Sequence, residues 1–506
     1  VKLTGLVGAR NLTATISSPS TITQTASVTI TYGAAVALRL NSATINANSG
    51  LTTGAIGDSA ARTALTINAT GDVTTGAVTS SAATTVAITG AGKVTTDLNA
   101  VVAPTITVAG SGAVTLGTLN NLVSKVTSTQ TGGSLTATLG SLVTQTIVGG
   151  AGNDVITTPS LVLTTGSVDG GAGTDTLDLG TNVANANTTT LAAKYTNFET
   201  LRVNGTYDAS LIGSLTAIEL SGATNAITGM TATQAANVTA RADIGATTLA
   251  LAAATGTSDV ASITFGTGTT TAAATNAGAL TVTGFETLNI KATPGPTAAT
   301  AANMLTTVAS LVGATLNKVN MTGSAVAITN AATTVAATFD ASQLTGDSNA
   351  TIGTAAASIK GLTLAGDLAS GSTVIGSNFV DTLTVGATGA AGSSYSAGAG
   401  NDAISVAPAN LRTGSVYNLI DGGAGTDTLT VSGGAALTLV DADFKGLTNI
   451  EKITVTSTTT NAQSITTGGF FDANFKGAGV TFTTTSTDGN VALDASTFSG
   501  AATVVA

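Results

Sequence analysis

The chain has 506 residues, of which 43% are hydrophobic and only 8% charged, with a net charge of −10 and no His, Cys or Trp. This composition excludes intrinsic disorder, and the missing His and Cys exclude disulfides, nucleophilic triads and imidazole or thiolate metal sites. The basic residues are few and scattered, so nucleic acid is not an expected partner, and no apolar run reaches the roughly 18 residues of a membrane span.

Residues 1–146 contain a short repeat in which two apolar residues, separated by one residue, are followed by three spacers, Gly, one further residue and Val-Thr. Its copies begin at Leu65, Val86 and Ile106, in almost equal steps. The alternation predicts strands, and the glycine marks the bend into the next strand. A constant step of about 20 residues predicts the rungs of a parallel β-solenoid. A sandwich of short Thr-rich strands is the alternative.

A different motif opens the next segment, residues 147–364. The run Gly149-Gly150-Ala151-Gly152-Asn153-Asp154-Val155-Ile156-Thr157 is a copy of the nonapeptide G-G-x-G-x-D-x-U-x, in which U is a large apolar residue, and a second copy has its acidic position at Asp175. Glycines allow a tightly curled backbone whose carbonyl oxygens point inward, and the Asp adds a carboxylate. Such oxygen-only ligand sets suit Ca²⁺, so the segment is predicted to begin with a calcium-binding β-roll.

The same pair of motifs recurs in residues 365–506, with acidic positions at Asp402 and Asp427. A weaker copy contains Asp381, and the interval from Asp381 to Asp402 equals that from Asp154 to Asp175. If this interval is one coil, such carboxylates would stack about 4.8 Å apart. Two bare carboxylates at that distance repel by about 3 to 4 kcal/mol at an effective dielectric near 20, and a bound cation would reverse this. Ordinary surface turns, which also favour Gly and Asp, are the alternative.

These motifs predict a set of calcium ligands in two rolls. Four aspartates are predicted as direct ligands, one as a weaker candidate because its repeat lacks two of three glycines, and two as either ligands or supports for ligands. Backbone carbonyls near eight glycines would complete the shells. The residues, in that order, are Asp154, Asp175, Asp402 and Asp427; Asp381; Asp169 and Asp421; and Gly150, Gly152, Gly171, Gly173, Gly398, Gly400, Gly423 and Gly425.

Three of the four glutamates lie in predicted strands of similar sequence: Glu199, Glu286 and Glu451. Glu199 follows Asp175 at the same interval at which Glu451 follows Asp427, whereas Glu286 has no calcium motif just before it. A catalytic carboxylate generally needs a second acid or base nearby, and nothing at fixed spacing supplies one. We therefore expect a structural role, such as accepting backbone N–H groups or pairing with a basic neighbour such as Arg202 or Lys452.

With these motifs in view, the chain resembles the RTX-type, type I secreted surface-layer (S-layer) proteins of Gram-negative bacteria, of the Caulobacter kind. The resemblance rests on the calcium motifs, the Ala/Thr/Gly-rich composition without Cys, and softer similarity at residues 197–203, 254–260 and 339–342. It is clearest over residues 147–460 and only compositional before that.

The resemblance implies a non-enzymatic structural protein that is secreted, folds in millimolar Ca²⁺ and self-assembles into a two-dimensional lattice on the cell surface, outside the outer membrane. It also implies attachment to lipopolysaccharide through a segment not in this chain. Neither a helical anchor nor a C-terminal secretion signal is recognised, so the chain is expected to be the lattice-forming core of a longer protein.

Two other functions stay open. A calcium-stabilised adhesin or extracellular fibre subunit would share the same physics, and only the geometry of assembly separates it from a sheet. A polysaccharide-active enzyme on a β-solenoid is the less favoured alternative, because the chain has only 5 Tyr and 16 Lys and Arg to build a sugar site.

Overall fold

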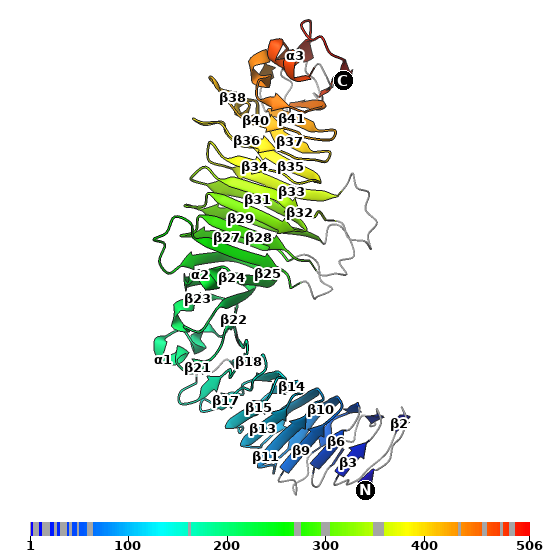
Figure 1. The fold of residues 1–506 in the computed structure, drawn as a ribbon, viewed down its shortest axis with the longest axis vertical. Helices are drawn as coiled ribbons and strands as arrows, with labels where there is room; N and C mark the ends of the chain where they lie inside the picture. The colour runs from blue at the N-terminus through cyan, green and yellow to red at the C-terminus, as the bar shows by residue number, and fades with distance from the viewer. Residues whose placement is uncertain are drawn as a thin grey trace. The chain divides into compact units, whose positions relative to one another are not determined.

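The computed structural model describes residues 50–57, 64–159, 163–267, 275–294, 304–347, 359–433, 437–457, 463–475, 479–484 and 491–505 continuously, and short strands alone before residue 50. The chain forms two compact units, Val1–Glu219 and Leu220–Ala506. In each unit the strands stack in parallel as the rungs of a solenoid (Figure 1). The predicted all-β, parallel β-solenoid fold is confirmed.

One sheet of the first unit collects alternate strands of successive rungs, all paired in parallel. Its strands are β1 (Lys2–Leu3), β3 (Thr21–Gln24), β6 (Ala43–Ala47), β9 (Ala64–Ala69), β11 (Thr85–Gly90), β13 (Thr105–Gly110), β15 (Lys125–Gln130), β17 (Thr146–Val148), β19 (Ser167–Asp169) and β21 (Tyr195–Thr196). They are rich in Thr, Val and Ile, which fit a pleated surface that is buried on one face.

The remaining strands of the first unit lie between these in sequence and form the other wall of the solenoid. They are β2 (Arg10–Leu12), β4 (Val28–Ile30), β5 (Leu38–Arg39), β7 (Leu51–Thr53), β8 (Ile56–Gly57), β10 (Val73–Ser80), β12 (Val94–Val101), β14 (Val114–Thr118), β16 (Leu135–Thr138), β18 (Val155–Thr157), β20 (Thr176–Gly180), β22 (Thr200–Val203) and β23 (Thr206–Asp208). Strand β24 (Ala217–Met230) contains the division between the units.

The second unit repeats this plan with longer strands in its middle rungs, drawn in green and yellow in Figure 1. One column of strands contains β25 (Val238–Leu251), β27 (Ala277–Thr283), β29 (Leu305–Gly313), β31 (Ala325–Thr333), β33 (Lys360–Asp367), β35 (Val380–Val385), β37 (Ala403–Val406), β41 (Thr428–Gly433), β44 (Lys452–Ser457), β46 (Val480–Thr484) and β48 (Ala502–Val505). The other contains β26 (Val260–Phe265), β28 (Thr287–Ala292), β30 (Lys318–Gly323), β32 (Thr338–Leu344), β34 (Thr373–Ile375), β36 (Ser394–Ser396), β40 (Leu419–Asp421) and β43 (Leu447–Thr448).

The described residues contain few other elements. A small parallel sheet is made of β42 (Leu437–Leu439), β45 (Gln463–Thr466) and β47 (Val491–Asp494), and an antiparallel hairpin of β38 (Arg412–Thr413) and β39 (Val416–Tyr417). The helices are α1 (Thr189–Ala192), α2 (Ala232–Ala235) and α3 (Gly469–Phe475), with 3-10 turns η1 (Val183–Asn185), η2 (Ala209–Leu211), η5 (Pro408–Asn410) and η6 (Asp441–Phe444). No helix in these ranges is long and apolar enough to cross a membrane.

Columns of apolar side chains, one from each rung, form the core of each unit. In the first unit one fully buried column runs through Leu65, Val86, Ile106, Val126, Ile147 and Val168. In the second unit a similar column runs through Leu364, Leu383, Ile404, Leu429, Ile453 and Phe482. Burying a side chain of this size stabilises the fold by about 1.5–3 kcal/mol, so these columns hold the rungs in register.

The register of the rungs bears directly on the repeats seen in the sequence. Leu65 pairs with Val86 and Val86 with Ile106, which confirms the predicted rungs of the first segment. The predicted segment boundaries at 146/147 and 364/365 fall inside strands β17 and β33, so they do not coincide with a break in the sheets. The compact units divide at 219/220 instead.

Candidate metal centres

The predicted aspartates lie at the starts of successive rungs and stack on one another. In the first unit Asp154 and Asp175 precede β18 and β20, which pair in register, and in the second unit Asp381, Asp402 and Asp427 lie at β35, β37 and β41. All five are buried, with at most 1% of each residue exposed. The predicted stacking is therefore present in both units, including the longer step between Asp402 and Asp427, in which the hairpin β38–β39 absorbs the extra residues.

Each aspartate accepts a backbone hydrogen bond from the preceding rung. In the first unit Leu135 N–H donates to Asp154 Oδ1 (2.6 Å), and Asp154 N–H donates to Asp175 Oδ1 (2.7 Å). The stack does not end there, because Asp175 N–H donates to Glu199 Oε2 (2.8 Å). We call Asp154, Asp175 and Glu199 the first carboxylate stack.

The second unit repeats this arrangement over one more rung. Leu362 N–H donates to Asp381 Oδ1 (2.5 Å), Asp381 N–H to Asp402 Oδ1 (2.7 Å), Asp402 N–H to Asp427 Oδ1 (2.8 Å) and Asp427 N–H to Glu451 Oε2 (2.8 Å). We call Asp381, Asp402, Asp427 and Glu451 the second carboxylate stack. Both glutamates accept backbone N–H groups, which confirms their predicted structural role. The suggested partner Arg202 instead pairs with Asp178 and Glu219.

Burial and mutual proximity make the stacked carboxylates poor acids. Burial, with repulsion from neighbouring carboxylates, raises the pKa of Asp175 and of Asp402 to about 7 and that of Asp427 to about 6. Burial alone raises the pKa of Asp381 to about 6 and also raises that of Asp154, against the hydrogen bonds that lower both. Burial therefore favours the protonated form, and no ion pair among the described residues offsets the charge of a stack carboxylate that is ionised.

Several carboxylate oxygens in the stacks have no hydrogen-bond partner. Within the described ranges, Oδ2 of Asp175, Asp402 and Asp427 is buried and accepts no donor. An unpaired buried polar atom costs about 1–3 kcal/mol, and more when it is charged. Such atoms therefore require either protonation or a bound cation.

Beside four of the stacked carboxylates lies a glycine at which the next rung comes so close that a Cβ atom has no room. A Cβ atom placed on Gly170 would touch the Asn197 carbonyl oxygen and lie 2.9 Å from Asp175 Oδ2, and one on Gly422 would touch the Asn449 carbonyl oxygen and lie 2.8 Å from Asp427 Oδ2. We call such a glycine position, flanked by a carboxylate oxygen and a carbonyl oxygen of the next rung, a cradle. Equivalent cradles lie at Gly149 and Gly376.

The cradle glycine is always the residue five positions before the aspartate. Before Asp402 this position is Ala397, so a methyl group stands where the other motifs have a glycine. The cradle carbonyls belong to Gly170, Asn197, Ala397 and Asn449, and none of them accepts a hydrogen bond from the described residues. Free oxygens of this kind are what a hard cation such as Ca²⁺ binds.

Some of the predicted glycine carbonyls already accept a hydrogen bond and are therefore not free to bind a cation. Gly150 O and Gly398 O already accept N–H groups of the next rung, from Ala172 (2.8 Å) and Ala424 (2.9 Å). A Cβ on Gly173, whose φ is +137°, would be 2.6 Å from Gly152 O, so close stacking of the turns requires glycine here. The other predicted glycines lie in the same turns: Gly171, Gly400, Gly423 and Gly425.

Asp169 and Asp421 have a visible role of a different kind. Asp169 Oδ1 accepts the Gly171 N–H (3.1 Å) and the Asn197 Nδ2 amide (2.7 Å), and Asp421 makes the same two bonds with Gly423 and Asn449. Asn197 and Asn449 have φ values of 55° and 50°, and within the described ranges no other non-glycine residue has a positive φ. These aspartates thus hold the asparagines whose carbonyls border the last cradle of each stack.

One further pair of carboxylates was not predicted from the sequence. Asp259 N–H donates to Glu286 Oε2 (2.8 Å), as in the two stacks, although no glycine-rich motif precedes Asp259. The only signal in the sequence is an aspartate before a strand whose next rung begins with Phe-Glu.

No group of three or more Asp, Glu, His or Cys side chains converges on one point in the part of the chain that the structure describes. The predicted shells use carboxylates of adjacent rungs together with backbone carbonyls. The unpaired Oδ2 atoms and the free carbonyl oxygens beside them fit that oxygen-only donor set, and the binding of Ca²⁺ stays a prediction.

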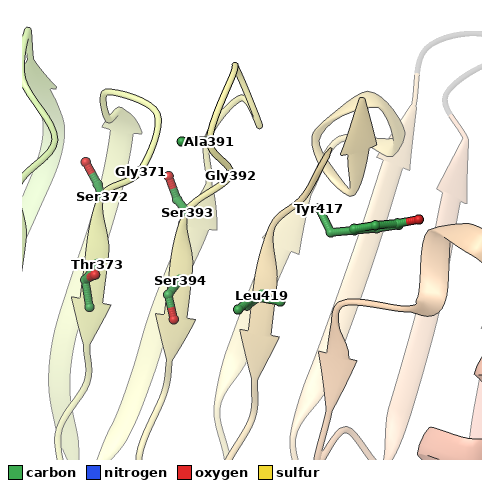
Figure 2. Close-up of a pocket in the computed structure, with 9 residues that line it drawn as sticks. All are labelled: Gly371, Ser372, Thr373, Ala391, Gly392, Ser393, Ser394, Tyr417 and Leu419. Atoms are coloured by element: carbon green, nitrogen blue, oxygen red, sulfur yellow. The ribbon is translucent and has the colours of Figure 1, made fainter. Parts of the chain in front are cut away.

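A separate shallow groove of about 240 Å³ lies over β34, β36 and β40 (Figure 2). Figure 2 shows Ser372 and Ser393 at the starts of neighbouring strands, with Leu419 on the next strand and Tyr417 beyond it. The residues that line the groove include no Asp, Glu, Lys or Arg, and none of the predicted ligands is among them.

No protein-family model matches the chain, and no curated protein matches it either.

Proposed function

We propose that the chain is a calcium-stabilised structural protein of a bacterial surface layer, secreted and self-assembling into a two-dimensional lattice outside the outer membrane. The observation that carries this proposal is the pair of buried carboxylate stacks, in which the unpaired Oδ2 atoms of Asp175 and Asp427 lie beside a carbonyl oxygen of the next rung. The buried carboxylate charges of such a protein would be compensated only where Ca²⁺ is plentiful, as it is outside a cell.

Calcium would supply positive charge to the stacks and link neighbouring rungs through shared oxygens. The direct ligands in this proposal are Asp154, Asp175, Asp381 and Asp427, each beside a cradle, with the carbonyls of Gly170, Asn197, Ala397 and Asn449. Asp402 stays in the set because its Oδ2 is buried and unpaired within the described ranges. Since the cation would be absent from the unfolded chain, its binding would be linked to folding.

The outer faces of the solenoid also suit close assembly. One outward column of the first unit runs through Thr66, Ala87, Thr107 and Thr127, which are short side chains without charge. Rigid faces with such side chains can approach one another closely, and the scarcity of charge limits repulsion between copies. In this proposal the main partner is a second copy of the chain, and attachment to lipopolysaccharide belongs to a segment outside it.

Electron microscopy of the purified protein tests the proposal. We expect ordered sheets in millimolar Ca²⁺ and none in excess chelator, with the double variant Asp175→Asn/Asp427→Asn needing more Ca²⁺ for the same order. Filaments instead of sheets would favour the adhesin or fibre alternative. Dispersed particles at every Ca²⁺ concentration would contradict both.

A further inference from the structure

The glutamates that end the two stacks occupy the position of an aspartate on the next rung. Thr176 pairs with Thr200, so the residues before them, Asp175 and Glu199, are equivalent on successive rungs. Thr428 pairs with Lys452 in the second unit, which makes Asp427 and Glu451 equivalent in the same way. Each glutamate is thus the last carboxylate of its stack, although it lies outside every nonapeptide.

The last cradle of each stack has a distinctive set of oxygens. Asp175 is fully buried, its Oδ2 has no partner within the described ranges, and this atom borders the cradle at Gly170. The second oxygen is the carbonyl of Asn197. This residue has a left-handed conformation, and its side-chain amide donates a hydrogen bond to Asp169. Glu199 follows Asn197 by two residues and uses Oε2 for the Asp175 N–H, which leaves Oε1 available.

We infer that the last cradle of each roll is a divalent-cation site shared by an aspartate and the terminal glutamate: Asp175, Glu199 and the Asn197 carbonyl in the first unit, and Asp427, Glu451 and the Asn449 carbonyl in the second. This inference rests on the proposed calcium binding and adds residues that the repeat motif does not include. Asp169 and Asp421 act as positioning residues, because they orient the asparagines.

The pair Asp259 and Glu286 shows what the site needs beyond two carboxylates. It keeps the backbone bonds of the other pairs, with Glu286 N–H and Thr287 N–H donating to Asp259 O at 3.0 Å. Gly284 replaces the asparagine, and the residue five before Asp259 is Ala254, whose Cβ lies 2.5 Å from where a Cβ on Gly284 would be. Ala254 thus carries a methyl group where the two stacks have a glycine. Oδ2 of Asp259 is also buried and without a partner within the described ranges, so this pair tests whether an unpaired carboxylate oxygen is enough without the glycine and the asparagine, and we expect it to hold no cation.

Calcium titration of the full chain by calorimetry, with melting temperatures in Ca²⁺, tests the inference. Glu199→Gln and Glu451→Gln keep an oxygen that can accept the aspartate N–H but remove the charge. We expect the double variant to bind Ca²⁺ about 10- to 100-fold more weakly at two sites, while Glu286→Gln titrates like the unmodified chain. If the double variant matches the unmodified chain, the glutamates are only hydrogen-bond acceptors and the inference is wrong, whereas the proposed function stands.

A second pair of variants tests the carbonyl and does not depend on the glutamates. Asn197→Gly permits a positive φ and should keep Ca²⁺ binding, whereas Asn197→Ala disfavours it and should weaken binding in the first unit. Equal titrations for the two would overturn the assignment of the carbonyl. An unmodified chain that binds no Ca²⁺ would overturn both this inference and the proposed function.

Discussion

The plain rungs at residues 64–133 and the roll rungs at residues 149–199 belong to the same unit, yet they satisfy one backbone N–H per rung in different ways. In the plain rungs a carbonyl of the next rung accepts it: Val73 N–H donates to Lys93 O (2.7 Å) and Val94 N–H to Ala113 O (2.8 Å). In the roll a carboxylate takes the place of that carbonyl, as Asp154 N–H donates to Asp175 Oδ1.

Because of this difference, the plain rungs are expected to be stable without a ligand, whereas the roll rungs are expected to need a cation. A backbone carbonyl satisfies the N–H without adding charge, so the plain rungs are complete as they stand. A buried carboxylate satisfies the same N–H but brings a charge whose effective burial penalty is several kcal/mol. The same sheets thus pass from a region held by packing and uncharged hydrogen bonds to one whose stability is expected to depend on a cation.

Removing Ca²⁺ should have the largest expected effect, because it should destabilise the roll rungs and leave the plain rungs intact. We expect hydrogen exchange in excess chelator to show loss of protection over residues 149–199 and 376–451, because the stacked charges are then uncompensated. Residues 64–133 should keep their protection and serve as the internal control. Uniform protection in chelator and in Ca²⁺ would remove the basis of the comparison.

The pH dependence should have opposite signs with and without Ca²⁺. In the metal-free fold the pKa values of Asp175 and Asp402 are raised to about 7 from 3.8, so their contribution to stability is complete below pH 3.8 and is lost as the pH rises through about 7. Bound Ca²⁺ holds the carboxylates ionised and lowers their pKa values, so its contribution is lost as the pH falls. Chemical denaturation from mildly acidic to neutral pH, in chelator and in Ca²⁺, measures both slopes, and slopes of the same sign would count against the stacks as cation sites.

Single substitutions in the stacks should weaken Ca²⁺ binding by a smaller, measurable amount. Asp175→Asn and Asp427→Asn keep the size of the side chain but remove the charge, and we expect about 10- to 100-fold weaker binding by calorimetry. Asp72 is the control: its Oδ1 accepts Lys93 N–H (2.9 Å) at an exposed position, and Asp72→Asn should change nothing. Equal effects for stack and control variants would refute the assignment.

The smallest expected effect is confined to the plain rungs. Asn68 donates to Asn46 Oδ1 (2.7 Å) and accepts from Thr89 Oγ1 (2.7 Å), forming a ladder of side chains across three rungs. Asn68→Ala should cost about 1–2 kcal/mol of stability, equally in Ca²⁺ and in chelator. A cost that appears in only one of the two conditions would mean that the plain rungs also depend on the cation.

The sequence predicted the rungs well because their signal is local and periodic. Alternation around Leu65, Val86 and Ile106 specified strands, and the regular spacing of Asp154 and Asp175 specified their stacking. These features follow from the geometry of one coil and need no long-range information.

The residues that were missed depend on loops of irregular length. Glu199 continues the stack after a longer interval than the one between Asp154 and Asp175, because η1 and α1 lengthen the rung, and its place in the stack is invisible until the rungs are in register. The cradle carbonyl of Asn197 was also missed, since a left-handed asparagine is set by the distant Asp169. Asp259 was missed because no glycine motif marks it.

The central claim is that the carboxylate stacks are cation sites, and anomalous diffraction from crystals grown in millimolar Ca²⁺ tests it most directly. The account predicts peaks in the cradles at Gly149, Gly170, Gly376 and Gly422, and none beside Ala254, which carries a methyl group at the position of those glycines. An intact fold with no peak in any of the four cradles would contradict it.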